Sequence, residues 1–230
     1  MAREGEDIGL RWEDGDLPVS ALFDDPFYSR TDGLAEARHV FLAGNDLPRR
    51  WARPGPFQIA ELGFGTGLNC LATAAMWETM EHRGRTLLYT SFELYPLPPS
   101  QTARALGCWP EHGDLAARLA EKAPDRCFEL IPGFHVEIIV GDAREHVPAW
   151  PCIADAWYLD GFAPARNPEL WEPGLLQAVY DHTAPEGTFA TYSAAGAVRR
   201  GLITAGFDVT RRPGFGTKRE MLSGRRQAPR

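Results

Sequence analysis

The residues with the clearest chemical potential lie between positions 61 and 69. Glu61 is followed by glycines at 63, 65 and 67, and then by Asn69. An apolar run precedes this stretch and an alanine-rich apolar segment at 71–80 follows it, so the pattern predicts a strand, a glycine turn and a helix. Glycines at such a turn let the backbone approach a ligand without Cβ atoms in the way. We therefore expect a nucleotide-like ligand at this turn.

The spacing of the glycines distinguishes between two nucleotide-binding folds. A dinucleotide fingerprint needs its third glycine at position 68, where this chain has Leu68, and this disfavours a nicotinamide oxidoreductase. Glycines at 63, 65 and 67 with an acid two places ahead resemble instead the first motif of the class I S-adenosylmethionine-dependent methyltransferases. The resemblance implies S-adenosylmethionine as the cofactor. It also implies cofactor contacts from Glu61, Gly63, Phe64, Gly65, Thr66, Gly67 and Asn69.

Two further acids follow predicted strands. Glu93 ends a β-favouring run at 86–92, and its carboxylate would offer two acceptor oxygens to a pair of ribose hydroxyls. The distance from the glycine turn is longer than the usual spacing of about twenty residues, and an exposed loop acid is the alternative. Asp142 follows a predicted strand at 134–140. In a methyltransferase this position lies at the adenine end of the cofactor, where a carboxylate accepts from the exocyclic amine.

A third acid, Asp160, comes directly after a predicted strand at 154–159 and opens the segment 160–164. Because ligands bind at the carboxyl ends of parallel strands, this segment is expected to face the glycine turn across a cleft. Asp160 is therefore a candidate both for catalysis and for contact with the cofactor. The alternative is an acid with a purely structural role.

These acids belong to a chain in which predicted strands and helices alternate. Its 230 residues suit one domain. We expect an α/β fold of the class I methyltransferase type, with a Rossmann-like, mostly parallel seven-stranded sheet and helices on both faces. Residues 1–56 are expected to form a small N-terminal extension of short strands and a helix. Residues 57–224 would form the methyltransferase domain, and 225–230 a basic tail.

Composition points to a soluble globular protein. The chain is 44% hydrophobic and 24% charged, and no apolar run approaches the length of about eighteen residues that a membrane span needs. Its first residues are polar and acidic and lack the pattern of a secretory signal, so we expect a cytoplasmic protein. Four cysteines at 70, 108, 127 and 152 have no paired spacing, which predicts neither a metal site nor a disulfide.

Taken together, these segments are similar to one particular family, the methyltransferase domain of the bifunctional tRNA 5-methylaminomethyl-2-thiouridine biosynthesis protein. The resemblance implies transfer of a methyl group from S-adenosylmethionine to the aminomethyl nitrogen on the wobble uridine of certain tRNAs. The matching segments run in order from about residue 18 to residue 222 and comprise 23–25, 28–29, 33–34, 40–42, 44–45, 63–69, 92–93, 141–142, 159–164, 167–168, 195–202, 214–216 and 218–222.

The resemblance suggests a specific role for Asp160. Methyl transfer is an in-line displacement, in which positioning of the reactants supplies much of the rate. The acceptor must also be a neutral amine, although an alkyl amine is largely protonated near pH 7. We expect Asp160 to accept its proton or its N–H hydrogen bonds. Phe162 and Pro164 would form an apolar wall or a stacking surface for a flipped-out base, and Tyr28 would contact the substrate unless it packs in the core.

The charge of the chain is unevenly distributed. A net charge of −7 would argue against a nucleic-acid partner, yet residues 199–230 hold nine basic side chains and two acidic ones, a local charge of +7. A tRNA anticodon stem-loop presents phosphates around the target base, and we expect Arg199, Arg200, Lys218 and Arg219 to contact them. A solvated tail is the alternative explanation.

Bifunctional members of this family carry a fused flavin-dependent oxidoreductase domain, which exposes the amine by removing a carboxymethyl group. No part of this sequence is expected to bind FAD, so we expect a stand-alone form that depends on another route or on a separate flavin oxidoreductase acting upstream. Two other functions stay open. A class I methyltransferase for a small-molecule amine would not need the basic C-terminal region, and a non-catalytic S-adenosylmethionine-binding protein would not need Asp160.

Overall fold

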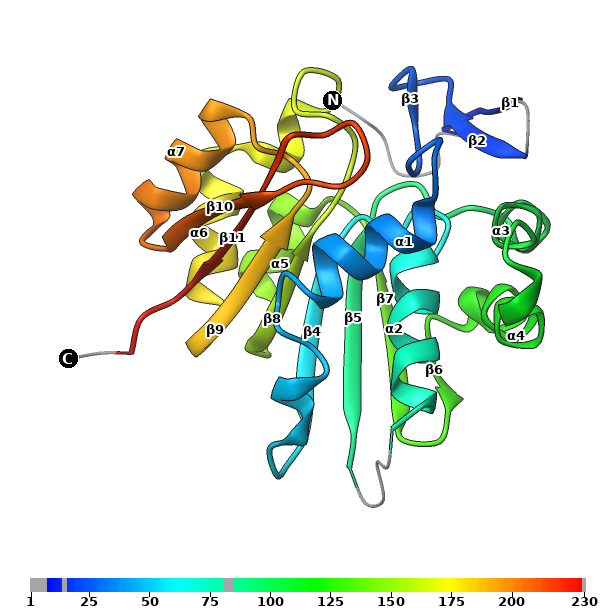
Figure 1. Cartoon of the computed structure of the whole chain (residues 1–230), viewed down its shortest axis with the longest axis horizontal. Helices are drawn as coiled ribbons and strands as arrows, with labels where there is room; N and C mark the ends of the chain where they lie inside the picture. The colour runs from blue at the N-terminus through cyan, green and yellow to red at the C-terminus, as the bar shows by residue number, and fades with distance from the viewer. Residues whose placement is uncertain (1–7, 14–15, 81–84, 229–230) are drawn as a thin grey trace.

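A large sheet separates two layers of helices in the computed structural model, which describes residues 8–13, 16–80 and 85–228 (Figure 1). The strand order is β10-β11-β9-β8-β4-β5-β7-β6, and the central strands from β9 to β7 are parallel to one another. The pairs at both edges are antiparallel. The strands of this sheet are β4 (Phe57–Leu62), β5 (Leu87–Glu93), β6 (Cys127–Ile131), β7 (Phe134–Val140), β8 (Ala154–Leu159), β9 (Thr183–Thr191), β10 (Asp208–Pro213) and β11 (Glu220–Arg225).

The predicted fold class is confirmed, but the prediction of seven strands is wrong, because the described sheet has eight. The additional strand is β6, which pairs antiparallel with β7 at the edge of the sheet. It is five residues long, and exposed Cys127 and Glu129 alternate with buried Phe128 and Leu130. A short run with two polar positions gives a weak strand signal in the sequence. The segment forms a strand because it pairs with β7.

The helices pack on the two faces of the sheet as separate layers. Helices α1, α2 and α4 contribute to the buried cluster on one face, and α5, α6 and α7 to the cluster on the other. The α-helices are α1 (Gly33–Ala37), α2 (Leu68–Glu78), α3 (Pro99–Leu106), α4 (Gly113–Lys122), α5 (Ala143–Ala149), α6 (Pro173–Asp181) and α7 (Gly196–Ala205). Shorter turns are a π-helical segment at Arg38–Leu42 and 3-10 turns at Arg49–Ala52, Pro110–His112, Ala123–Asp125 and Pro168–Trp171.

Helix α2 begins at the glycine turn and is buried on nearly every side. Its alanine-rich sequence permits this, because small side chains let α1 and α4 as well as the sheet pack closely against it. Gly67 caps the helix at φ +80°, and a Cβ there would lie 3.0 Å from the Phe64 ring. A side chain at this position would be strained and crowded, so the turn requires glycine.

The N-terminal region combines a small sheet with a helix that shares the main core. Strands β1 (Leu10–Glu13), β2 (Leu17–Ser20) and β3 (Asp25–Pro26) form an antiparallel sheet of their own. By contrast, Leu34, Val40 and Phe41 are buried in the same cluster as β4 and α2. The predicted domain boundaries stay a prediction, and residues 34–51 contribute buried side chains to the large sheet's core.

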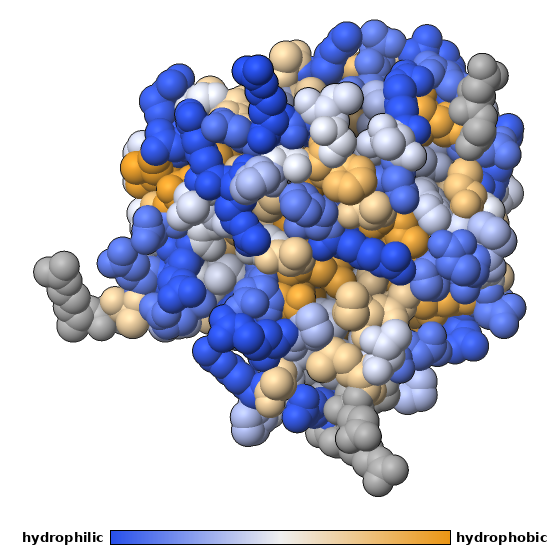
Figure 2. All heavy atoms as spheres, viewed as in Figure 1, coloured by the Kyte–Doolittle hydropathy of each residue, from blue (hydrophilic) through white to orange (hydrophobic). Residues whose placement is uncertain are grey.

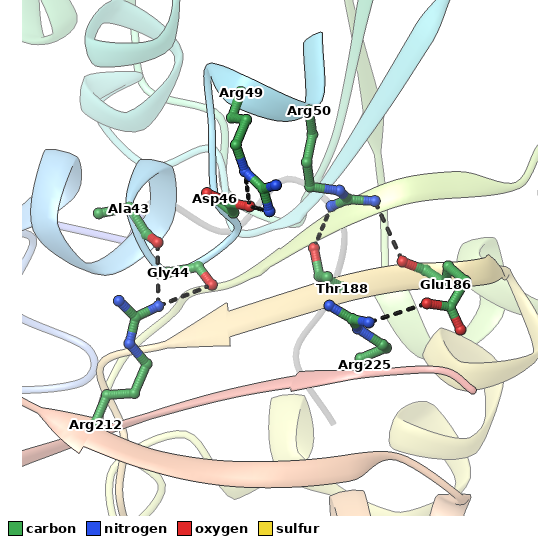
Figure 3. Close-up of polar contacts among 9 residues, drawn as sticks. All are labelled: Ala43, Gly44, Asp46, Arg49, Arg50, Glu186, Thr188, Arg212 and Arg225. Atoms are coloured by element: carbon green, nitrogen blue, oxygen red, sulfur yellow. Dashed lines mark hydrogen bonds and ion pairs between the residues drawn. The ribbon is translucent and has the colours of Figure 1, made fainter. Parts of the chain in front are cut away.

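A polar network at the amino ends of β8 and β9 holds this N-terminal segment in place (Figure 3). The buried guanidinium of Arg50 donates to the Thr188 hydroxyl and to the carbonyl oxygens of Asp155, at 3.0 Å, and Glu186, at 3.4 Å. Thr188 in turn donates to the side-chain oxygen of buried Asn45 at 2.6 Å. The network therefore ties residues 45–50 to the strand ends with hydrogen bonds that are shielded from water.

Polar side chains cover most of the face shown in Figure 2, with apolar side chains between them. Among the described residues, the large apolar side chains that stand exposed are Leu22, Ile153 and Ile203, which are far apart in the sequence. No helix in the described part of the chain is long and apolar enough to cross a membrane.

Candidate active site

A cavity of about 840 Å³ opens at the carboxyl ends of β4, β5, β7 and β8. Its volume lies in the range of small-molecule and cofactor sites. The sequence-predicted residues that line it are Tyr28, Gly63, Phe64, Gly65, Thr66, Asn69, Glu93, Asp142, Asp160, Phe162 and Lys218. The glycine turn and the segment after β8 lie against each other here, since a Cβ on Gly63 would be 3.6 Å from the Cα of Gly161.

Glu93 connects the end of β5 to the glycine turn. Its two carboxylate oxygens accept from the backbone N–H groups of Gly65 and Tyr95, both at 2.7 Å. Burial raises the pKa of Glu93, and these hydrogen bonds act in the opposite direction. A carboxylate has lone pairs beyond those used by the two N–H groups, so Glu93 retains acceptor capacity on the side of the cavity.

Asn69 joins two acids that the sequence places far apart. Its side-chain amide donates to Glu61 at 2.9 Å and to Asp160 at 2.6 Å. Glu61 itself is fully buried, does not line the cavity and accepts a second hydrogen bond from the Ser91 hydroxyl. Burial raises the pKa of Glu61 to about 8. In this geometry Glu61 reaches the cavity only through Asn69, so its predicted contact with the cofactor would have to be indirect.

Asp160 lies at the point where β8 leaves the sheet. One carboxylate oxygen accepts from Asn69 and the other from the backbone N–H of Gly161 at 2.9 Å. Burial raises its pKa to about 6, and these two hydrogen bonds counteract the shift. A carboxyl group with this pKa is ionised at neutral pH and is more basic than an ordinary aspartate, as a proton acceptor requires.

Asp142 caps the N-terminus of α5 and is paired with a cation. Its carboxylate accepts from the backbone N–H of Arg144 at 2.8 Å and forms an ion pair with the Arg144 guanidinium at 2.6 Å. The hydrogen bonds from this guanidinium hold the pKa of Asp142 below its usual value. Asp142 therefore lines the cavity as a carboxylate fixed in orientation by its neighbour.

An aromatic wall covers the cavity from the N-terminal side. Phe23 stacks on Phe162 with 4.6 Å between ring centroids, and Phe27 meets Phe162 edge-on at 5.1 Å. The Asp25 carboxylate accepts from the backbone N–H of Ala163 at 2.8 Å and fixes this contact. Phe23, Phe27 and Asp25 are not among the site residues predicted from the sequence. The signal was the concentration of aromatic and acidic residues at 23–29, but no local rule connects that segment to residue 162.

A second group at the cavity comprises Glu36, Tyr192 and Lys218. The Lys218 ammonium lies 2.8 Å from a carboxylate oxygen of Glu36 and 4.0 Å from the centre of the Tyr192 ring. The Tyr192 hydroxyl donates to the carbonyl oxygen of Gly161 at 2.6 Å. Lys218 was predicted at the site, whereas Glu36 and Tyr192 were not, because nothing in their local sequence indicates a shared location.

The remaining predicted residues occupy other positions. Pro164 and Arg219 line a shallower hollow next to the cavity, which Tyr192 and Lys218 also border. Arg199 and Arg200 lie on α7 and line neither. Tyr28, by contrast, lines the cavity. Its ring packs edge-on against Trp109 at 5.1 Å, and its hydroxyl donates to the carbonyl oxygen of Ala105.

The donor and acceptor set of the cavity fits a cofactor with hydroxyl groups, an amine and a positive centre. Carboxylates of Glu93, Asp142 and Asp160 lie at the ends of three different strands, and apolar Phe64 and Leu68 also line the cavity. Gly65 has φ +52°, and a Cβ there would lie 3.1 Å from the Phe27 ring. A side chain at this position would be strained and would crowd Phe27, so the turn requires glycine here. The cations that line the cavity include Arg144 and Lys218, which are paired with Asp142 and Glu36.

The comparisons with known proteins agree with this geometry. A family model described as S-adenosyl-L-methionine-dependent methyltransferase matches residues 116–227. The tRNA 5-methylaminomethyl-2-thiouridine biosynthesis bifunctional protein of Caulobacter vibrioides is 45% identical over 227 residues, covering 96% of this chain and 38% of that protein. Its namesake from Caulobacter sp. strain K31 is 47% identical over 224 residues, with 93% and 37% covered. This chain therefore spans well under half the length of these relatives.

The crystal structure of MnmC2 from Aquifex aeolicus superimposes with a TM-score of 0.76 at 24% identity, covering 98% of this chain and 73% of that one. This similarity supports the fold. Fold and family model together define the class as the class I S-adenosylmethionine-dependent methyltransferases, for which S-adenosylmethionine is the implied cofactor. Within that class, the chain belongs to the methyltransferase-domain family of the tRNA 5-methylaminomethyl-2-thiouridine biosynthesis bifunctional proteins.

Proposed function

We propose that this protein methylates the amine of 5-aminomethyl-2-thiouridine at the wobble position of tRNA, with S-adenosylmethionine as the donor. The observation that carries the proposal is Asp160, a partly buried carboxylate with a raised pKa beside the glycine turn, in a chain whose relatives are named for this tRNA modification. Such a tRNA substrate would be met in the cytoplasm.

The cofactor would be held between the glycine turn and the three acids. Glu93 lines the cavity and would accept from ribose hydroxyls, and Asp142 follows the next strand and would contact the adenine. Asn69, fixed between Glu61 and Asp160, would orient the amino-acid end. When bound, S-adenosylmethionine supplies a methyl group activated by its sulfonium. The protein's own task is to present a neutral amine in line with that methyl group.

Asp160 would perform the proton step of the reaction. The acceptor arrives as an alkylammonium, and its N–H proton passes to the Asp160 carboxylate, which leaves the nitrogen with a free lone pair. The two hydrogen bonds to Asp160, from Asn69 and from Gly161, hold the carboxylate in one orientation while this happens. The wall of Phe23, Phe27 and Phe162 would receive the apolar face of the flipped-out base.

Recognition of tRNA would depend on cations near the mouth of the cavity. Lys218 lines the cavity and Arg219 lines the adjoining hollow, whereas Arg199 and Arg200 lie on α7 and would contact more distant phosphates. Since each phosphate contact releases counterions, affinity for tRNA is expected to fall at least tenfold between 50 and 200 mM salt, as for about three contacts or more.

The direct test is mass spectrometry of wobble nucleosides after incubation of undermodified tRNA with the protein and a methyl-labelled donor. Label should appear on the nucleoside that carries the aminomethyl group, and the same tRNA without that group should stay unlabelled. Equal activity on the free aminomethyl nucleoside would favour a small-molecule methyltransferase. Donor binding in calorimetry without methylation of any tRNA would favour a non-catalytic cofactor-binding protein.

A further inference from the structure

Glu36 is a buried acid that the reaction as described above does not use. Its side chain is 11% exposed and lines the cavity from α1, and it is paired with the Lys218 ammonium at 2.8 Å. The two residues are separated by 182 positions in the chain. By contrast, the side chains of the ion pair between Arg225 and Glu186 are both about half exposed. Figure 3 shows this pair.

The surroundings of Glu36 favour a compact cation. A carboxylate shielded from water is unstable without a partner of opposite charge, so this position calls for a cation. The Tyr192 ring presents its face to the Lys218 ammonium at 4.0 Å, a cation–π geometry. The carboxylate and the ring therefore form a subsite for a primary ammonium group, and the protein's own lysine displays how such a group fits.

This subsite lies close to Asp160. The negative charge of Glu36 raises the pKa of Asp160, and the positive charge of Lys218 lowers it, so both charges act on that carboxylate. Tyr192 is linked to the same segment through its hydrogen bond to the Gly161 carbonyl oxygen. An ammonium group held here would be a neighbour of the group proposed to take its proton.

We propose that Glu36 and the face of Tyr192 bind the acceptor in its alkylammonium form, and that Lys218 occupies this subsite until the acceptor replaces it. The inference rests on the proposed function and adds a determinant of specificity to it. A uridine with a cationic substituent gains an ion pair, whereas one with a neutral or carboxylate-bearing substituent does not. The displaced Lys218, whose side chain is 42% exposed, is free to pair with a tRNA phosphate next to Arg219.

The first experiment measures binding without donor, so that its result does not depend on turnover. Affinities are compared for one tRNA with 5-aminomethyl-2-thiouridine and for the same tRNA with 2-thiouridine. The intact protein should prefer the amine-bearing tRNA about tenfold, as expected for one charge-assisted hydrogen bond. Glu36→Gln should reduce the preference to about twofold or less, and Lys218→Ala should increase it because the competing ammonium is gone.

Glu186→Gln is the matched control, since it removes one carboxylate from an ion pair of similar length at 3.0 Å, on the exposed β9–β11 surface. Its preference should equal that of the intact protein. Tyr192→Leu is a second variant in case Glu36→Gln does not fold, and it should lower the preference about threefold, consistent with an exposed cation–π contact.

The second experiment observes Lys218 directly. The chain has two lysines, Lys122 and Lys218, so a sample labelled at the lysine ε-carbon gives two NMR signals. In the free protein the Lys218 signal should show a ring-current shift that Tyr192→Leu abolishes. The amine-bearing tRNA should remove this shift, the 2-thiouridine tRNA should leave most of it, and Lys122 serves as the internal reference.

The outcomes separate the two proposals. If the intact protein methylates the tRNA but binds both tRNAs equally, or if Glu36→Gln keeps the full preference, the ammonium subsite is wrong and the proposed function stands. If both tRNAs release Lys218 to the same extent, phosphates rather than the amine displace it, and the placeholder role is wrong. If neither tRNA binds or is methylated, the proposed function itself fails and the subsite has no such substrate.

Discussion

The two ends of the large sheet use buried polar residues in opposite ways. At the amino ends of β8 and β9, the Arg50 guanidinium donates to Thr188 and to two backbone carbonyl oxygens. At the carboxyl ends, hydrogen bonds from the protein hold the carboxylates of Glu93 and Asp160 in place. These bonds use only part of the hydrogen-bonding capacity of each carboxylate. One end is closed by its hydrogen bonds, and the other lines a cavity of about 840 Å³.

This difference shows that the carboxyl end of the sheet carries a group that serves the reaction but lowers the stability of the fold. Burial raises the pKa of Asp160 to about 6, so the folded state binds this proton more tightly than the unfolded chain, where the value is near 3.8. The stability contributed by the protonated carboxyl is present below pH 3.8 and is lost as pH rises through about 6. At neutral pH, ionised Asp160 destabilises the fold, whereas Arg50 at the other end holds segments together.

The largest effect is expected from Asp160→Asn. Methylation turnover should fall at least a hundredfold, because the amide cannot take a proton from the acceptor. Affinity for S-adenosylmethionine should stay within a few fold, as measured by calorimetry. The thermal midpoint at pH 7.5 should change little, because the variant removes a destabilising charge but also replaces one of the two oxygens that accept from Asn69 and Gly161. Full turnover would contradict the role of Asp160, and a sharp loss of stability would contradict the contrast between the two ends.

Arg50→Met should produce the complementary result. The change leaves the Thr188 hydroxyl and the carbonyl oxygens of Asp155 and Glu186 without their donor, so the free energy of unfolding should fall by about 3 kcal/mol. Urea titration measures this loss. Turnover per folded molecule should stay within twofold, since Arg50 is remote from the cavity residues. A loss of turnover in fully folded protein would show that the amino end also serves the reaction.

How far the sequence predicted this architecture depends on whether a signal is local. The glycine turn and the acids after β5, β7 and β8 could be recognised because strand, turn and acid are adjacent in the chain, and parallel strands bring their carboxyl ends together. The same reasoning could not find β6, whose five residues need β7 as a partner. It also could not show that Glu61 is buried behind Asn69, since position in a motif does not reveal which way a side chain points.

Contacts between distant segments explain the other features of the site that could not be predicted from the sequence. Phe23, Phe27 and Glu36 reach the cavity because the N-terminal segment folds over the sheet, and no spacing rule links them to Phe162 or Lys218. The C-terminal charge is also partly absorbed internally. Lys218 and Arg225 form ion pairs, and Arg212 and Arg226 donate to backbone carbonyl oxygens. Counting charges along the chain therefore overstates the number of cations left for phosphate.

The pH dependence of turnover tests the raised pKa of Asp160 at the carboxyl end of β8. With saturating donor and tRNA, turnover should fall about tenfold between pH 7 and pH 5, because Asp160 becomes protonated near pH 6 and can no longer accept. Asp142 has a lowered pKa and stays ionised in this range, so it should not contribute. The residual activity of Asp160→Asn should lack this limb. A limb near pH 4 instead would indicate an ordinary, well-solvated carboxylate.

The smallest effect is expected from the residue next to Arg50. Arg49 forms an ion pair with Asp46, but its side chain is 80% exposed, and exposed pairs contribute little because water and salt screen them (Figure 3). Arg49→Ala should change the free energy of unfolding by about 0.5 kcal/mol or less in urea titration, and it should not alter turnover. The losses in the free energy of unfolding caused by substituting these two adjacent arginines would then differ several-fold because of burial alone. A loss as large as that of Arg50→Met would mean that positive charge in this region, rather than buried hydrogen bonding, stabilises the amino end of the sheet.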